Sequence, residues 1–257
     1  MSRETVIYKK IASVAEITLN PLQSKNAVIP QMAAEMSAVR DEISTDNDIR
    51  VIIIKGEGEA AFSEWDESVK LPLGANGTEN MERLSIASLV GLFDLPTIAA
   101  INGQTAGQGL EVALACDLRI CSETASFAVP QVTRGAIPWD GGTQRLPRLV
   151  GRAKAIEMIL TGEVLEAQEA YRIGLVNRVV PPKELFGVVM EMAREMASKG
   201  PIALRYAKEA IHKGMDLTLD QGLRLEADLY FLLHTTRDRV GGIKAFRNKG
   251  KPDFEGR

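Results

Sequence analysis

The first half of the chain alternates between strand-like and helix-like patterns of apolar positions. Residues 6–20 alternate apolar and polar side chains, which predicts two short strands joined by a turn. A helical pattern runs from Pro30 to about Ser44, and the β-branched run 51–54 predicts a strand buried on both faces. A helix ending near Phe93 and a second buried strand at 97–101 follow. Strands and helices that recur in this order predict an α/β fold.

Beyond Asp140 the pattern becomes almost wholly helical. Only residues 175–180 have the pattern of a strand in this half. Composition does not shift sharply anywhere, so we expect a mixed core of about 200 residues with a helical C-terminal part, not two independent domains. The predicted helices cover Gly142–Val150, Ala153–Leu160, Ala167–Ile173, Leu185–Ser198, Ile202–Lys213 and Leu217–His234.

Composition is that of an ordinary water-soluble protein. The 257 residues are 45% hydrophobic and 25% charged, with a net charge of −3. Nucleic acid and anionic membrane are therefore not expected as partners, because either would require a surplus of Lys and Arg. The first residues, MSRETVIYKK, contain no apolar run, and no segment approaches transmembrane length. We expect a cytoplasmic protein.

Cysteine and histidine are too scarce for several common chemistries. The spacing of Cys116 and Cys121 fits neither a redox pair nor a zinc site, and their apolar surroundings favour inert core thiols. The two histidines, His212 and His234, lie in late helical segments. We therefore expect no metal site and no serine–histidine catalysis.

Candidate chemistry is concentrated in residues 102–145. This stretch combines a glycine-broken turn with Glu111, Gln131 and the adjacent pair Trp139 and Asp140. Glycine allows a backbone to approach a ligand closely, and an N–H group at a helix start stabilises negative charge. A carboxylate one turn into that helix can move protons beside an oxyanion. The pattern predicts an active site.

Six segments, in order along the chain, resemble a known family. They are SKNAV at 24–28, AFSEW at 61–65, AAINGQTAGQGLEVALACDLRICSETASFAVPQ at 99–131, GGTQRLPRLVG at 141–151, ILTGEVLEAQEAYRIGLVNRVVP at 159–181 and the tail IKAFRNKGKPDFEGR. Together they are similar to the crotonase (enoyl-CoA hydratase/isomerase) superfamily over nearly the whole chain.

The resemblance implies a fold and an assembly. Residues 1–200 would form a spiral core of repeated ββα units. Residues 201–257 would form a helical region that builds homotrimers, often paired into hexamers, and that covers coenzyme A. The ligand would be an acyl-CoA thioester, so that coenzyme A belongs to the substrate and no separate cofactor is implied.

The resemblance also assigns binding positions. The thioester oxygen would lie between the N–H groups of Asp66 and Gln108, and such donors typically contribute roughly 3–4 kcal/mol each to transition-state stabilisation. Both tryptophans fall in loops around the acyl pocket, where they would narrow it or provide a flat wall for a ring, unless they are ordinary core residues. The substrate-binding positions are Lys25, Ala27, Glu64, Trp65, Gly107, Trp139 and Phe246.

Three site residues decide the reaction. Glu111 matches the glutamate that holds or deprotonates water in hydratases, although a structural carboxylate near a helix start is the alternative. Gln131 stands where hydratases have a second glutamate. An amide cannot exchange a proton with carbon, so Gln131 either orients water or substrate or does not contact the ligand.

Asp140 is the second departure from the family pattern, which is glycine-rich here. A carboxylate in this loop is similar to the nucleophile of aryl-CoA dehalogenases and to a proton-transfer residue of β-diketone hydrolases. It suggests that the acid/base function lost at Gln131 has moved to Asp140. The alternative is a cap for the helix that starts near Gly141.

The sequence therefore predicts an enzyme that acts on acyl-CoA. The first hypothesis is a hydratase or dehydratase of an enoyl-CoA with a cyclic or bulky acyl group, in which an oxyanion hole stabilises an enolate. A hydrolase of a thioester, C–C or C–halogen bond that uses Asp140 is the second. A double-bond isomerase and a non-enzymatic CoA-binding scaffold remain open as well.

Overall fold

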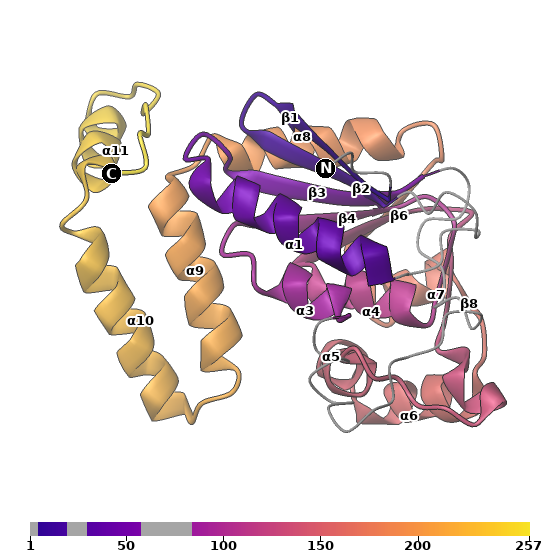
Figure 1. Ribbon diagram of the computed structural model, residues 1–257. Helices are drawn as coiled ribbons and strands as arrows, with labels where there is room; N and C mark the ends of the chain where they lie inside the picture. The colour runs from indigo at the N-terminus through magenta and orange to yellow at the C-terminus, as the bar shows by residue number, and fades with distance from the viewer. Residues whose placement is uncertain (1–4, 20–29, 58–83) are drawn as a thin grey trace.

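The fold is built around one central sheet with helices on both faces. A computed structural model describes residues 5–19, 30–57 and 84–257, and every structural statement below concerns these residues. Figure 1 shows the sheet near the middle of the molecule and a pair of long helices that project to one side.

The central sheet has six strands in the order β1-β2-β3-β4-β6-β9. The first two strands pair antiparallel, and every other pair is parallel. The strands are β1 (Val6–Ile11), β2 (Val14–Leu19), β3 (Val51–Gly56), β4 (Thr97–Ile101), β6 (Leu118–Ser122) and β9 (Arg178–Val180).

Strand β3 is buried on both faces, as its sequence predicts. Ile52 and Ile54 join one hydrophobic cluster, and Val51 and Ile53 join another. Successive side chains of a strand point to opposite faces, so an unbroken β-branched run requires helices on both sides. The first cluster includes residues of α1 (Pro30–Thr45), α3 (Ile86–Gly91) and α4 (Gln108–Ala115), and the second includes residues of α8 (Leu185–Ala197).

A second, three-stranded sheet lies next to helix α4 in the chain. Its strands are β5 (Gln104–Ala106), β7 (Ser126–Ala128) and β8 (Leu165–Glu166), in that order, and the 3-10 helix η1 (Pro130–Arg134) follows β7. The β5–β7 pairing aligns Ala106 with Ala128, so the segments that carry Gln108 and Gln131 leave this sheet side by side.

Of the remaining helices, α5 and α6 lie at the lower right of Figure 1, α7 lies above them, and α9, α10 and α11 form an arm that projects to the left. Helices α9 and α10 run antiparallel and α11 lies beyond their end. No helix of the described ranges is both long and apolar enough to cross a membrane. These helices are α5 (Gly142–Val150), α6 (Arg152–Thr161), α7 (Ala167–Arg172), α9 (Pro201–Gly214), α10 (Leu219–Leu233) and α11 (Arg237–Arg247).

The helices predicted after Asp140 are confirmed to within a few residues, but several elements were not predicted. Strands β5 and β7 have three residues each, too few for a periodic pattern. In β6 the buried Arg119 interrupts the apolar run, and its guanidinium donates to the backbone oxygens of Leu175 and Cys116 at 2.8 and 2.6 Å. Helix α11 contains two adjacent glycines, which hide its pattern.

Asp117 attaches the projecting arm to the body. Its carboxylate accepts from the N–H of Thr97 at 2.7 Å, pairs with Lys208 at 2.8 Å and lies 2.8 Å from the ring Nε2 of His212. Burial alone would raise the pKa of Asp117, but the His212 hydrogen bond and the Lys208 charge lower it overall. One carboxylate therefore joins helix α9 to the start of strand β4.

Removal of this carboxylate should loosen the arm. Asp117→Ala leaves the ammonium of Lys208 without its anionic partner, and we expect the free energy of unfolding to fall by about 3 kcal/mol in urea titrations. The matched control is Asp216→Ala, because Asp216 pairs with Arg148 at 3.5 Å in an exposed position. Its loss should change stability by less than about 1 kcal/mol. Equal effects of the two variants would contradict the role given to Asp117.

Candidate active site

Helix α4 starts at a glycine and carries Glu111 in its first turn. Gly107 has φ +56° and ψ −128°, a conformation that residues with a side chain rarely adopt. Its N–H donates to the backbone oxygen of Ala128 at 3.1 Å, which ties the start of the helix to strand β7. Gln108 is the first helical residue, and N–H groups at this position have no partner within the helix. Such a group needs a partner from outside the helix.

Glu111 is buried, with 1% of its surface exposed. One carboxyl oxygen, Oε1, accepts from the N–H of Asp140 at 2.9 Å and from the N–H of Gly142 at 2.7 Å. The other, Oε2, is buried and has no hydrogen-bond partner among the described residues. One oxygen thus fixes the carboxyl group, and the second is available for chemistry.

The surroundings of Glu111 raise its pKa to about 7. Burial is the main cause, and the negative charge of Asp140 adds to it, while the hydrogen bonds from Gly142 and Asp140 act in the opposite direction. Near neutral pH both the acid and the base form of Glu111 are therefore populated. A group of this kind can take up a proton and release it again.

Gly142 is required by this arrangement. A Cβ atom at this position would lie 2.9 Å from Oε1 of Glu111 and 2.9 Å from Cβ of Pro138. Any side chain would push the carboxylate away from the backbone N–H groups that hold it.

Asp140 is as deeply buried as Glu111, and both of its oxygens are occupied. The hydroxyl of Ser85 donates to Oδ1. The N–H of Ala87 and the side-chain amide of Gln108 both donate to Oδ2, each at 3.0 Å. Burial raises the pKa of Asp140 although these hydrogen bonds oppose the shift.

The interpretation of Asp140 as a cap for the next helix is wrong. The cap position of helix α5 is Gly141, which has no side chain, and the first N–H of the helix, that of Gly142, donates to Glu111 and not to Asp140. The Asp140 side chain turns instead to the start of helix α3, where Ser85 is the cap residue. Asp140 therefore joins three segments: the start of α3, the start of α4 and the loop that holds Glu111.

Gln131 lies in η1 and is 8% exposed, and its side-chain oxygen has no hydrogen-bond partner within the described ranges. The pairing of β5 with β7 brings its segment beside Gly107. Trp139 is half-buried next to Asp140. The structure thus brings together Gly107, Gln108, Glu111 and Asp140 through hydrogen bonds, with Gln131 on the adjoining segment.

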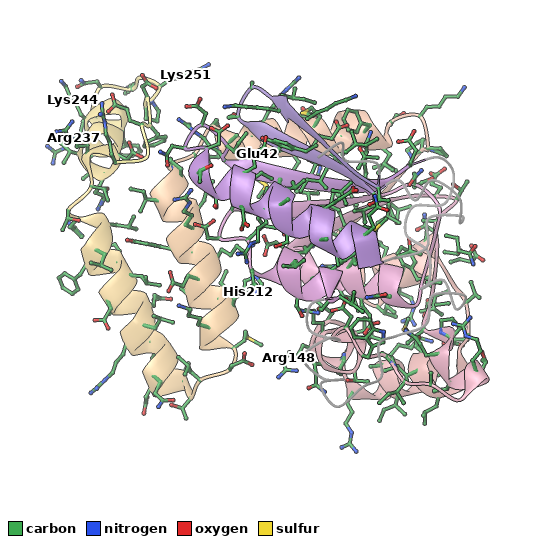
Figure 2. All side chains as sticks on the ribbon, in the orientation of Figure 1. Glu42, Arg148, His212, Arg237, Lys244 and Lys251 are labelled. Carbon is green, nitrogen blue, oxygen red and sulfur yellow. The ribbon has the colours of Figure 1, made fainter. Side chains whose placement is uncertain are left out.

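The remaining predicted site residues either lie outside the described ranges or are distant from this group. Lys25, Ala27, Glu64, Trp65 and Asp66 lie outside the described residues. Phe246 is 86% exposed on helix α11, which lies far from α4 and α5 in the same chain (Figure 1). In Figure 2, Lys244 and Lys251 of the charged tail lie at the upper left, away from Arg148 of α5 at the lower middle.

Sequence reasoning missed two residues of the site. Ser85 precedes an apolar run as a typical helix cap, but nothing local connects it with Asp140, 55 positions later. Arg145 donates to the backbone oxygen of Asp140 at 2.8 Å, and its charge lowers the pKa of Glu111. No group of three His, Cys, Asp or Glu side chains in the described part of the chain is arranged to hold a metal ion.

Comparison with known proteins assigns the family. Residues 9–257 match the family described as enoyl-CoA hydratase/isomerase. The chain belongs to this family. The predicted crotonase fold, with two sheets and C-terminal helices, is confirmed by a crystal structure of enoyl-CoA hydratase from Bacillus anthracis. That structure has a TM-score of 0.93 and 36% identity, and the match covers 99% of this chain and 100% of that one.

Two further relatives within the enoyl-CoA hydratase/isomerase family have named substrates or activities. A short-chain-enoyl-CoA hydratase of Clostridium acetobutylicum is 37% identical over 98% of this chain and 97% of its own length. An (E)-benzylidenesuccinyl-CoA hydratase of Thauera aromatica is 37% identical over 95% of this chain and 96% of its own length. These relatives confirm the predicted enzyme class, an enoyl-CoA hydratase-like lyase.

The buried Glu111 should destabilise the folded protein at high pH. Its folded pKa lies above its ordinary value of 4.5, so the folded state loses stability as pH rises from 4.5 through about 7. Glu111→Gln removes this ionisation. We expect the stability of the variant relative to the native protein to increase by about 3 kcal/mol between pH 4.5 and pH 8 in chemical denaturation.

Glu35 provides a control of opposite sign. Burial would raise its pKa, but hydrogen bonds from Gln31, from the hydroxyl and N–H of Thr5 and from the N–H of Val6 lower it to about 2. Its ionised form stabilises the fold above its ordinary pKa, so Glu35→Gln should cost stability at pH 8 and less at low pH. A pH-independent effect of Glu111→Gln would contradict the raised pKa of Glu111.

Proposed function

We propose that this protein hydrates the C=C bond of an enoyl-CoA, or dehydrates the corresponding alcohol, with Glu111 as its single proton-transferring carboxylate. The observation that carries the proposal is the state of this side chain. One oxygen is anchored by two backbone N–H groups and the other is unpartnered among the described residues, with a pKa of about 7. A buried base of this pKa suits the activation of water.

One carboxylate can complete the whole reaction. Glu111 Oε2 takes a proton from water while the water oxygen bonds to the β-carbon and the C=C electrons move to the thioester oxygen. The N–H of Gln108 stabilises the resulting enolate, with the N–H of Asp66 as the second donor implied by the resemblance. The neutral carboxyl group then returns the proton to the α-carbon. Water has been added, and Glu111 is again a carboxylate.

Gln131 contributes to this reaction by orienting water. Its side-chain oxygen is buried and unpartnered within the described ranges, so it can accept one water hydrogen while Glu111 accepts the other. Both hydrogens are then engaged, and a lone pair of the water oxygen faces the substrate. The amide holds the water without taking part in proton transfer.

Asp140 is assigned a positioning role. Its two oxygens accept from Ser85, Ala87 and Gln108, and its own N–H holds Glu111. A nucleophilic attack by Asp140 would require it to give up these hydrogen bonds in a buried environment. The hydrolase hypothesis is therefore less favoured than hydration. Double-bond isomerisation is the second candidate, since one carboxylate can move a proton between two carbons of a bound acyl group.

The assay should separate these reactions. Incubation with crotonyl-CoA and with a 3-enoyl-CoA, followed by mass spectrometry, distinguishes water addition, free CoA and an unchanged mass with a shifted double bond. We expect water addition, and a decrease in kcat of about a thousandfold in Glu111→Gln. The kcat/KM of the native protein should fall with pH below about 7, because the base form of Glu111 is required.

Asp140→Asn is the matched control. Its amide oxygen can still accept from Ala87 and Gln108, so the site geometry is retained while the charge is lost. We expect most of the activity to remain and the acidic limb of the profile to move to lower pH, because the Asp140 charge raises the pKa of Glu111. Complete loss of activity in a folded Asp140→Asn protein would instead support Asp140 as acid or nucleophile.

We further propose that residues 1–200 form the catalytic core and that residues 201–257 build a homotrimer or a hexamer in the cytoplasm. Helices α10 and α11 expose large apolar side chains to solvent in the single chain: Leu219, Leu223, Tyr230, Phe231, Leu232, Val240 and Phe246. Apolar surface of this extent supports an interface between subunits. Phe246 would then cover the coenzyme A of a neighbouring subunit.

This assembly can be measured by light scattering after size-exclusion chromatography. The native protein should have three or six times the mass of the 28.0 kDa chain. Phe231→Glu places a charge in the apolar surface of α10 and should reduce the mass toward that of the monomer. Lys183→Glu, exposed next to helix α8, should leave it unchanged. A monomeric native protein would contradict the proposal.

A further inference from the structure

Gln108 contributes a side chain to the site in addition to its backbone N–H. The residue is 2% exposed, and its amide nitrogen donates to Asp140 Oδ2 at 3.0 Å. Its amide oxygen, Oε1, is buried and has no hydrogen-bond partner in the part of the chain that the structure describes. A buried carbonyl oxygen without a partner is rare in folded proteins, which points to a partner supplied by a ligand.

Asp140 determines which way this amide faces. The N–H of Ala87 can only donate, and it donates to the same Oδ2 atom at 3.0 Å. When Oδ2 carries no proton it can only accept, and the NH2 group of Gln108 is then the end of the amide that binds it. The oxygen of the amide must point away from Asp140. The O and NH2 ends of an amide have similar shapes, so the hydrogen-bond partners decide which way this amide faces.

The site holds more acceptors than one water molecule can satisfy. Among Gln108, Glu111 and Gln131, each side chain has one buried oxygen without a partner among the described residues: Oε1 of Gln108, Oε2 of Glu111 and Oε1 of Gln131. In the proposed reaction the attacking water donates its two hydrogens to Glu111 and Gln131. The thioester oxygen is an acceptor and binds N–H groups. One acceptor, Gln108 Oε1, is left for the substrate.

We infer that Gln108 selects an acyl group that carries a hydrogen-bond donor, namely a hydroxyl close to the C=C bond. The inference rests on the proposed hydration, because the N–H of Gln108 then binds the thioester oxygen and brings the side chain next to the acyl chain. An acyl carboxylate is disfavoured at this place. It has no hydrogen to donate, and it would lie near the buried acidic groups of Asp140 and Glu111.

Chain-matched substrates test this selection. The measured quantity is the ratio of kcat/KM for 4-hydroxycrotonyl-CoA to that for crotonyl-CoA, and for 5-hydroxy-2-pentenoyl-CoA to that for 2-pentenoyl-CoA. We expect at least one of these ratios to exceed about ten in the native protein. In Gln108→Met, which has a similar length and no amide, that ratio should fall to about one.

Each other outcome overturns the inference. Native ratios of about one or below show that no hydroxyl is recognised. If Gln108→Met lowers kcat/KM equally for plain and hydroxylated substrates, the amide oxygen binds the pantetheine part that all substrates share. A preference for 2,3-dehydroadipyl-CoA over crotonyl-CoA contradicts the exclusion of carboxylates.

The inference can also be tested without a variant. If Gln108→Met does not fold, inhibition of the native protein by butyryl-CoA and 4-hydroxybutyryl-CoA replaces it, since neither analogue has a C=C bond to hydrate. We expect about tenfold tighter inhibition by the hydroxylated analogue, and equal inhibition overturns the inference. Failure of the proposed function is separate. It would appear as an absence of water addition to every enoyl-CoA, whereas failure of this inference leaves hydration of crotonyl-CoA intact.

Discussion

The structure depends on the burial of a carboxylate at the start of helix α4. Glu111 has 1% exposure and is held by the N–H groups of Asp140 and Gly142, which belong to a loop 29 and 31 positions later. Burial raises its pKa to about 7 and therefore opposes folding at high pH. The protein tolerates this cost because the same burial makes the group a base near neutrality. The positive φ at Gly107 and the absence of a side chain at Gly142 both serve this one placement.

A second buried carboxylate has a different task, and the difference follows from its hydrogen bonds. Glu111 leaves one oxygen without a partner among the described residues, whereas Asp140 uses both oxygens to bind Ser85, Ala87 and Gln108. The first arrangement suits proton transfer, and the second fixes distances between helices. Two acidic groups in one buried region also repel each other, which raises the pKa of Glu111 further. In the proposed reaction, Asp140 would act through position and charge without contact with the reacting atoms.

The helical arm carries the apolar surface that the proposed assembly would use. Asp117 attaches α9 to the body through Thr97, Lys208 and His212, while α10 and α11 expose apolar side chains and carry Phe246 far from the Glu111 of the same chain. A firm attachment at one end and an unburied surface at the other are what an arm needs if it is to reach a neighbouring subunit. In the proposed function, the carboxylate of Glu111 and its anchors belong to one chain, and the cover over coenzyme A would come from the next.

The sequence by itself determined the α/β layering, the two buried strands 51–54 and 97–101, most helices and the position of Glu111, because these are encoded in local periodicity or in motifs that resemble the family. It also predicts that Gln131 and Asp140 depart from the family pattern. Only the tertiary structure decided what Asp140 binds, since Ser85 lies 55 positions away and no local pattern encodes that contact. Only the tertiary structure also decided the raised pKa of Glu111 and the direction in which the Gln108 amide faces. Both arise from burial and from hydrogen bonds between distant segments, which exist only once the chain has folded.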